Sequence, residues 1–364
     1  MKLFYFLVFA SVLLFVSCED NKFNLVEPEI SENFTFIPNV PTWHGLYDWY
    51  YQDENLFAIL PIKLDSNFHY GYLIQKSTDD GTTWIDFLII DPKSLPVPDT
   101  SININVQDFT IANNGDYYFV GCGYLFKSKD KGKLWLRVND PGEYIKNMNR
   151  IDEHYIHNLY KDNIGNLFAR DELYGFFKSS NNGESWEYNI VEKPYFYFNT
   201  FDDKLILLDN NDFKISFNNG VSWEKALVNN DDIYYNSEFP MHSFVRGENN
   251  ILFWSVTNGW WDNSYILTSY DNGKSWNSKK IIFSNLIIYK ILLVNQKNHI
   301  YAIFAENGGG YFTGSQHGIY KSIDSGQTWQ NVIHLYFYNK CLLTKDNHIL
   351  YSDYGVWMSN FKLE

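Results

Sequence analysis

Polar turn clusters rich in Asn, Asp and Gly recur along the chain, and each leads into a short run of alternating or continuously apolar residues. A polar turn that opens such a run is typical of a β-hairpin. Hairpins repeated in this way predict an all-β fold, and a repetitive fold can use the whole length as one domain. The seven predicted second strands open at Leu56, Tyr117, Leu167, Leu205, Ile251, Ile300 and Ile349.

A second pattern, Ser-x-Asp/Asn-x-Gly-x-x-Trp, recurs six times where predicted third strands end. Its Asp or Asn is suited to accept backbone N–H bonds within a tight turn, and its Gly to a positive φ that a side chain would forbid. The Trp begins the next strand and packs its ring on the sheet. We therefore expect a structural role for Asp79, Asp130, Asn181, Asn218, Asp271 and Asp324, in copies that start at Ser77, Ser128, Ser179, Ser216, Ser269 and Ser322.

The six copies resemble the Asp-box, or BNR repeat, of the propellers in sialidases, sortilin-type receptors and other secreted proteins. The resemblance implies a β-propeller of four-stranded antiparallel blades over residues 34–364. Seven hairpins favour seven blades, and six blades remain the alternative if the terminal segment is only a cap. The last predicted third strand ends at Ser359, and the chain stops where a seventh box would begin.

The outer strand of the last blade must therefore come from elsewhere in the chain. The segment 34–39 resembles the outer-strand stretch 135–140 and immediately precedes the first blade. We expect it to pair with the last blade and close the ring, which removes the exposed edges of an open sheet.

The N-terminus has the three regions of an export signal. Met1-Lys2 is a short positive start, an apolar run follows to Val16, and Ser17-Cys18 ends it; the run is too short for a membrane span. Its ending resembles the lipobox of bacterial lipoproteins, which implies a signal peptide over 1–17, a lipidated Cys18, and a tether over 18–33.

The acidic residues Glu19 and Asp20 resemble those of surface-exposed lipoproteins of Bacteroidetes. The expected location is the bacterial outer membrane, lipid-anchored and facing outward, with a periplasm-facing position as the alternative. An ordinary secretory signal with a chance Cys is the other interpretation.

Charge and cysteine content narrow the choice of partners. Twenty-nine basic and 43 acidic residues give a net charge of −14, which repels nucleic acid and disfavours packing of the body against anionic lipid. Cys122 and Cys341 lie in apolar strand-like runs, so buried free thiols are expected rather than a disulfide. No cofactor is expected, and the nine His show no paired spacing for a metal. We expect a monomer.

The connections between second and third strands are longest in blades 1, 5 and 6, and they are rich in aromatic residues. In a propeller these connections lie on the face opposite the Asp-box turns. Exposed aromatic rings beside amides and carboxylates are suited to stack on sugars. The alternative is that they cover the loops' own small core. The candidate ligand-binding residues are Trp43, Tyr70, Trp260, Trp261, Tyr311, Phe312 and His317.

Catalysis is not expected, and no catalytic residue is assigned. The resemblance to sialidases implies three arginines that hold the substrate carboxylate, but the chain has four in total, and Arg137 and Arg246 are predicted away from the loops. The sequence favours a non-catalytic recognition module. Glycan is the preferred ligand class, and protein is the second. A glycoside hydrolase that uses two loop carboxylates is the alternative, with candidates Asp171, Glu172, Asp262 and Glu306.

Overall fold

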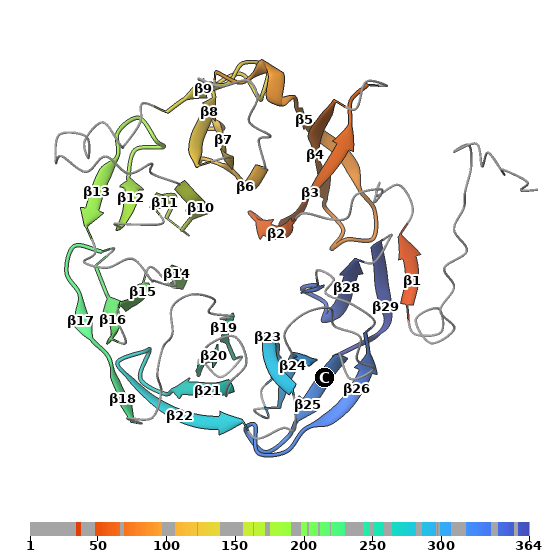
Figure 1. Ribbon diagram of the computed structural model, residues 1–364, viewed down its shortest axis with the longest axis vertical. Helices are drawn as coiled ribbons and strands as arrows, with labels where there is room; N and C mark the ends of the chain where they lie inside the picture. The colour runs from red at the N-terminus through yellow and green to blue at the C-terminus, as the bar shows by residue number, and fades with distance from the viewer. Residues whose placement is uncertain are drawn as a thin grey trace, which may run out of the picture.

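The structure is a computed structural model, and its described residues form seven sheets arranged as blades around a central axis (Figure 1). This confirms a seven-bladed β-propeller over the six-bladed alternative. Apart from the short 3-10 turn η1 (Pro92–Ser94), the described residues contain no helix. They are 34–37, 48–65, 69–96, 106–121, 123–138, 156–162, 164–171, 175–190, 198–201, 204–209, 212–218, 220–229, 243–247, 251–257, 264–281, 286–295, 297, 299–306, 318–335, 341–352 and 356–363.

Each blade is an antiparallel sheet whose first strand lies nearest the axis (Figure 1). Blade 1 contains β2 (Asp48–Gln52), β3 (Asn55–Lys63), β4 (Tyr70–Ser77) and β5 (Ile85–Ile90). Blade 2 contains β6 (Val106–Ile111), β7 (Tyr117–Gly121), β8 (Tyr124–Ser128) and β9 (Leu136–Arg137). Blade 3 contains β10 (Ile156–Lys161), β11 (Leu167–Asp171), β12 (Gly175–Ser179) and β13 (Glu187–Ile190).

The remaining blades follow the same order around the ring (Figure 1). Blade 4 contains β14 (Phe198–Phe201), β15 (Lys204–Asp209), β16 (Asp212–Ser216) and β17 (Glu224–Lys225). Blade 5 contains β19 (Ser243–Arg246), β20 (Leu252–Thr257), β21 (Ser264–Ser269) and β22 (Ser275–Ile281). Blade 6 contains β23 (Leu286–Val294), β24 (Ile300–Glu306), β25 (Gly318–Ser322) and β26 (Gln330–His334), and blade 7 contains β27 (Cys341–Leu343), β28 (His348–Ser352), β29 (Val356–Lys362) and β1 (Phe34–Ile37).

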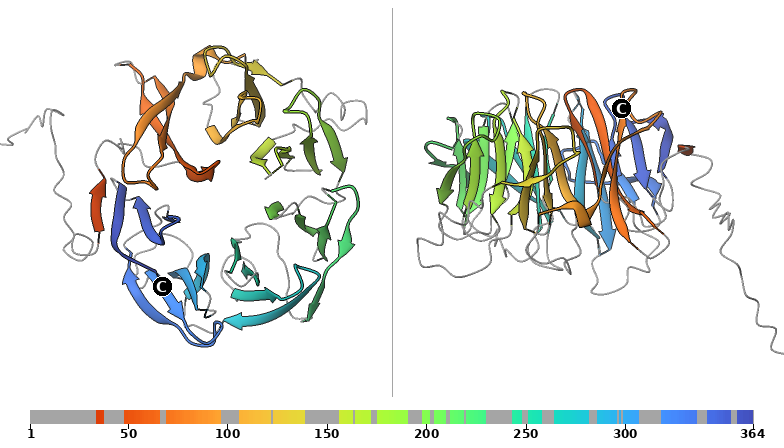
Figure 2. Two further views of the ribbon diagram at one scale, coloured as in Figure 1. Left: turned by 180° about the vertical axis from the view of Figure 1, so that it is seen from behind. Right: turned by 90° about the horizontal axis from the view of Figure 1, so that it is seen from above.

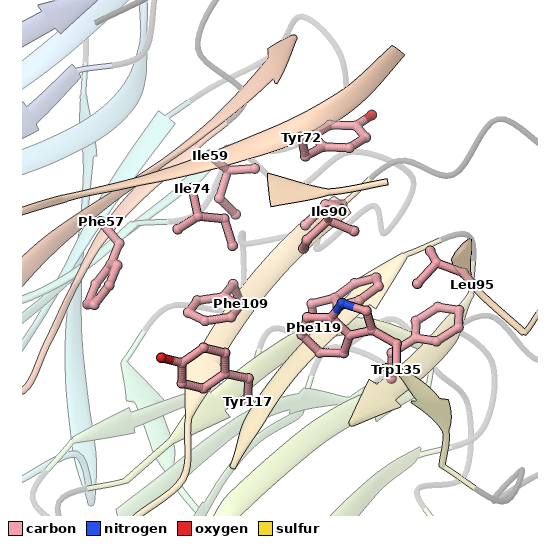
Figure 3. Close-up of a cluster of buried hydrophobic side chains, with 12 residues drawn as sticks. Phe57, Ile59, Tyr72, Ile74, Ile90, Leu95, Phe109, Tyr117, Phe119 and Trp135 are labelled. Carbon is pink, nitrogen blue, oxygen red and sulfur yellow. The ribbon is translucent and has the colours of Figure 1, made fainter. Parts of the chain in front are cut away.

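The hydrophobic cores lie between neighbouring blades. Successive side chains of a strand point to opposite faces of its sheet, and in β3 both faces are covered. Phe57 and Ile59 pack with Phe109 in the core that blade 1 shares with blade 2 (Figure 3), whereas Ala58 packs with Leu350 of blade 7. Because both faces are buried, the middle strands are continuously apolar rather than alternating.

The seventh blade joins the two ends of the described chain. β1 pairs antiparallel with β29, from Phe34 opposite Ser359 to Ile37 opposite Val356. The ring of Phe34 lies 5.9 Å from that of Tyr351, centroid to centroid, and Phe34 is 2% exposed. β29 continues to Lys362, three residues beyond the end at Ser359 that the box spacing predicts.

One sheet has a fifth strand that the sequence analysis did not predict. β18 (Leu227–Asn229) follows the outer strand of blade 4 and pairs in parallel with β22, the outer strand of blade 5. It begins with a hydrogen bond from the Leu227 amide to the Lys274 carbonyl, at 2.9 Å. Blades 4 and 5 are therefore joined by a strand pair at their outer edge as well as by a core.

A buried cation joins blades 2 and 3. The Lys127 ammonium lies 3.0 Å from an Asp116 carboxylate oxygen and 2.8 Å from one of Glu184, and Lys127 is 7% exposed. Burial alone would lower the pKa of Lys127, but its hydrogen bonds to Glu184, Tyr118 and Asp116 raise that pKa above its ordinary value. Hydrogen bonds from Lys127 and Lys129 lower the pKa of Glu184 to about 2.

Glu184→Gln should lower the melting temperature at pH 7 by an amount that fades in acid. The pKa of Glu184 is depressed in the folded protein, so its contribution is complete above the ordinary value of 4.5 and is lost as pH falls towards about 2. The measurement is the melting-temperature difference between parent and variant across this window. Glu187→Gln, in the adjoining outer strand, is the control, and a Glu184 effect that does not change with pH would contradict the ion pair.

Candidate functional site

The two faces of the ring carry different connections (Figure 2). Third strands end and fourth strands begin at the face that we call the box face, because it carries the six Ser-x-Asp/Asn-x-Gly-x-x-Trp turns. Second strands end and third strands begin at the opposite face, which we call the loop face. In blade 1, for example, Leu56 pairs with Ser77 at the box face, and Lys63 with Tyr70 at the loop face.

The first box turn shows what its side chains do. The Ser77 hydroxyl oxygen accepts the Gly81 amide at 2.8 Å and donates to Asp79 Oδ1 at 2.8 Å. Asp79 Oδ1 also accepts the Thr83 amide at 2.8 Å, and the Trp84 indole N–H donates to the Gly81 carbonyl at 2.9 Å. Burial opposes ionisation of Asp79, but these hydrogen bonds hold the pKa of its carboxyl below the ordinary value.

The other five boxes repeat the hydrogen bonds made by the Ser and by the Asp or Asn. In each, the Ser hydroxyl accepts the Gly amide at 2.7 or 2.8 Å, and the Asp or Asn oxygen accepts an amide four residues on at 2.8 to 3.0 Å. The acceptor atoms are therefore used within the turn. The residues that do this are Asp130, Asn181, Asn218, Asp271 and Asp324.

On the loop face, blade 1 presents a cluster of polar and aromatic side chains. His69 Nε2 lies 2.9 Å from an Asp91 carboxylate oxygen, and Nδ1 lies 3.6 Å from one of Asp65. The His69 amide also donates to Asp65 at 3.2 Å, and Asp91 accepts the amide of Lys93 at 2.9 Å where η1 begins. These contacts hold the start of β4, where the next residue, Tyr70, is 43% exposed.

Tyr70 is the one candidate ligand-binding residue within the described part of the chain. Trp43, Trp260, Trp261, Tyr311, Phe312 and His317 lie outside the described residues, as do Cys18 and Cys122. The strands on either side show where the longest connections start and end. β20 ends at Thr257 and β21 begins at Ser264, while β24 ends at Glu306 and β25 begins at Gly318, all at the loop face.

The blades that carry the long connections are neighbours. Blades 5, 6, 7 and 1 are consecutive around the ring (Figure 1). Ligand-binding side chains on their loop-face connections would therefore share one arc of that face. The contacts of His69 with Asp65 and Asp91 were not predicted, although the antiparallel pairing of β4 with β5 places the end of β5 beside the start of β4, with Tyr72 opposite Ile90.

Several residues that bear on catalysis lie within the described part of the chain. The guanidinium carbon of Arg137 lies 4.3 Å from the centre of the Tyr124 ring, in the outer part of blade 2, and Arg246 ends β19 at the box face. The strand-end acids Asp171 and Glu306 belong to blades 3 and 6, which are not neighbours. No group of three His, Cys, Asp or Glu within the described ranges is placed to hold a metal ion.

Two further features bear on the expectations from sequence. Cys341 is a buried free thiol, and burial raises its pKa to about 12. In the described part of the chain, no helix is long and apolar enough to cross a membrane.

Comparisons with known proteins identify the fold of this chain. The sequence matches no protein-family model and no curated protein. The structure is similar to YCF48 bound to D1 peptide, with a TM-score of 0.53 and 13% identity over 91% of this chain and 96% of that chain. It is also similar to PorZ, an essential bacterial surface component of the type-IX secretion system of Porphyromonas gingivalis, with a TM-score of 0.56 and 13% identity over 86% of this chain. The match covers 46% of PorZ, so the chain spans about half that protein's length. At these identities the likeness establishes that this chain has the β-propeller fold.

Proposed function

We propose that this chain is an Asp-box propeller that serves as a recognition module at the bacterial outer surface, held to the outer membrane by a lipid on Cys18. Its ligand is a glycan, bound without catalysis by the aromatic side chains of the loop face, and protein is the second ligand class. The observation that carries this proposal is the half-exposed Tyr70 beside His69, Asp65 and Asp91 on that face.

The chemistry of that cluster suits a sugar. An aromatic ring offers an apolar face for the C–H side of a pyranose, and carboxylates offer lone pairs to its hydroxyls. The hydrogen bond from the His69 amide to Asp65 and the approach of His69 Nε2 to Asp91 restrain the cluster before binding, which reduces the ordering cost of binding. Further aromatic residues from blades 5 and 6 would extend this surface along the same arc.

The similar propellers support the proposal in two respects. YCF48 has been observed with a bound peptide, which shows that a propeller of this shape takes protein ligands as well. PorZ is a bacterial surface component, in agreement with the location proposed here. The lipidated Cys18 and the Asp-box family assignment rest on the sequence motifs themselves.

Replacing Trp260 and Trp261 with Ala should weaken glycan binding far more than it weakens folding. Trp is enriched among residues that dominate interfaces, while surface substitutions away from a packed core usually stay within about 0.5 kcal/mol of the parent's stability. The measurements are melting temperature and retention on immobilised polysaccharides, made on the same double variant.

The opposite order of effects would contradict this proposal. A double variant that melts clearly lower but still binds what the parent binds would mean that these rings pack within their own loop. Release of new reducing ends during the retention assay would favour the glycoside hydrolase alternative instead.

Cys18→Ala in the full chain should move the protein from the membrane fraction to the soluble fraction. Each buried acyl CH₂ contributes about 0.8 kcal/mol, and several chains together give stable anchoring. The measurement is detergent phase partitioning of parent and variant. Equal partitioning of the two would contradict the lipid anchor and leave an uncleaved or secretory signal as the explanation.

A further inference from the structure

The second position of the box repeat divides the ring into two halves. In blades 1 to 3 it is polar: Thr78, Lys129 and Ser180. In blades 4 to 6 it is apolar or aromatic, and the side chains are exposed: Phe217 at 37%, Tyr270 at 68% and Ile323 at 68%. These three residues, which we call the apolar arc, each follow the last residue of a third strand and so lie at the box face.

Because the blades repeat, the three residues of the apolar arc lie at the same height on the box face. The three residues occupy the same motif position in consecutive blades, and the six boxes share one hydrogen-bonding geometry. Blades related by rotation about the ring axis hold equivalent atoms at equal height. A flat surface laid on the box face would therefore meet Phe217, Tyr270 and Ile323 together, which a curved or narrow ligand would not do.

Other exposed apolar side chains lie beside the arc in blades 4 and 5. Val221, in the same turn as Phe217, is 80% exposed, and Leu227 of β18 is 65% exposed. The Lys274 ammonium lies 5.3 Å from the centre of the Phe217 ring, and its carbonyl accepts the Leu227 amide, so the box turns of the two blades meet here. In blades 7 and 1, by contrast, the box face is closed by polar contacts, with Asp80 accepting the amides of Lys345 and Asp346 at 3.1 and 3.0 Å.

Local charge differs from the net charge. The exposed cations Lys225, Lys274 and Lys297 flank the arc, against the exposed Glu224. The box carboxylates of Asp271 and Asp324 accept amide and hydroxyl donors within their turns and still carry their negative charge, so three acids match the three lysines. Because charges farther away than a Debye length of about 8 Å are screened, the net charge of −14 does not govern contacts at this surface.

The chain also enters the ring from this side. β1 begins at Phe34, opposite Ser359 near the box-face end of β29, and runs towards Val356 at the loop-face end. Residues 1–33, with Cys18 among them, therefore join the ring at the box face. A lipid on Cys18 would draw this face, rather than the loop face, towards the bilayer.

We propose that the box face over blades 4 to 6 lies on the bilayer surface, with Phe217, Tyr270 and Ile323 in the headgroup region. Aromatic rings favour the membrane interface, and the balanced charges around the arc do not oppose contact with neutral headgroups. The loop face then points away from the membrane, towards ligands outside. This inference rests on the proposed lipid anchor for how the face is brought to the membrane, but the contact itself is independent of the lipid.

Vesicle flotation of a chain that lacks the lipid tests the contact of the box face separately from the lipid anchor. All seven blades come from residues 34–363, so a chain that starts at Glu19 keeps the whole ring. We expect it to float with phosphatidylcholine vesicles, whose headgroups carry no net charge. Replacing Phe217, Tyr270 and Ile323 with Ser should weaken flotation roughly tenfold or more, because interfacial binding scales with the apolar area inserted.

The matched control removes apolar side chains from the outer edge of the ring. Ile85, Ile89 and Leu136 are 61%, 53% and 55% exposed on the outer strands of blades 1 and 2, and replacing them with Ser should leave flotation unchanged. The proposal is overturned if the parent ring does not float, if the arc variant floats like the parent, or if both triple variants lose flotation equally. None of these outcomes affects the Cys18→Ala test.

Discussion

Deleting residues 30–40 should cause aggregation or a large loss of thermal stability, because it removes β1 and leaves β29 as an unpaired edge. Phe34 and Ile37 are 2% and 5% exposed and belong to the cores on the two sides of blade 7. Losing a buried Phe side chain alone costs about 3–5 kcal/mol, a large share of a typical stability of about 5–15 kcal/mol. An exposed edge also offers a template for association.

Point variants in the same strand make this expectation sharper. Phe34→Ala should lower the melting temperature strongly, while Phe36→Ala should have a small effect, because Phe36 is 46% exposed. Deletion of residues 19–29 is the control for the longer deletion and should change stability little. Similar behaviour of the two deletions, or of the two Phe variants, would mean that β29 does not depend on β1 for closure.

Gly183→Ala should destabilise the protein much more than Gly115→Ala, although both glycines have a positive φ, of 72° and 87°. A non-glycine residue in that conformation costs about 1–2 kcal/mol, and both variants incur this cost. A Cβ on Gly183 would lie 2.2 Å from the Tyr118 hydroxyl oxygen, whereas a Cβ on Gly115 meets nothing within 4 Å. Overpacking adds about 1–3 kcal/mol at Gly183 alone.

Denaturant unfolding of the two variants measures this difference. Its origin is the contact between blades, since Tyr118 of blade 2 donates its hydroxyl to the Asn182 carbonyl in the box turn of blade 3 at 2.7 Å. Tyr118→Ala would remove both the hydroxyl and the ring carbons that obstruct this Cβ, so the Gly183→Ala penalty should shrink in that background. Equal penalties for Gly183→Ala and Gly115→Ala would contradict a packing role for the box turn.

Much of the fold follows from short-range patterns. The predicted openings of the second strands agree with the observed ones to within one residue, from Leu56 against Asn55 in blade 1 to Ile349 against His348 in blade 7. Turn residues and burial on both faces dictate these boundaries, and both are visible locally in the sequence. The number of blades follows directly from the number of hairpins.

Features that depend on contacts between blades were less predictable. β18 has three residues, Leu227–Asn229, of which two are exposed, so no periodicity distinguishes it from a loop. The outer strands vary in length, with two residues in β9 and β17 but six in β5, and no local pattern in the sequence marks where each one ends.

The side-chain contacts of the candidate site were likewise not visible in local sequence patterns. The contacts of His69 lie within blade 1, where the pairing of β4 with β5 brings Asp91 beside the start of β4. The hairpin was predictable from the sequence, but the side-chain contacts at its open end were not. The apolar arc, in contrast, could have been found by comparing the second residue of each box, Phe217 in blade 4 against Thr78 in blade 1. That position is outside the four that define the repeat.

The most direct test of the proposed function asks which face holds the ligand. Tyr70 on the loop face and Tyr270 on the box face are 43% and 68% exposed, so each serves as the control for the other. Retention on a panel of polysaccharides should fall by about tenfold or more in Tyr70→Ala and stay at the parent's level in Tyr270→Ala. Loss of retention in Tyr270→Ala with Tyr70→Ala unaffected, or a parent chain that no polysaccharide retains, would contradict glycan recognition by the loop face.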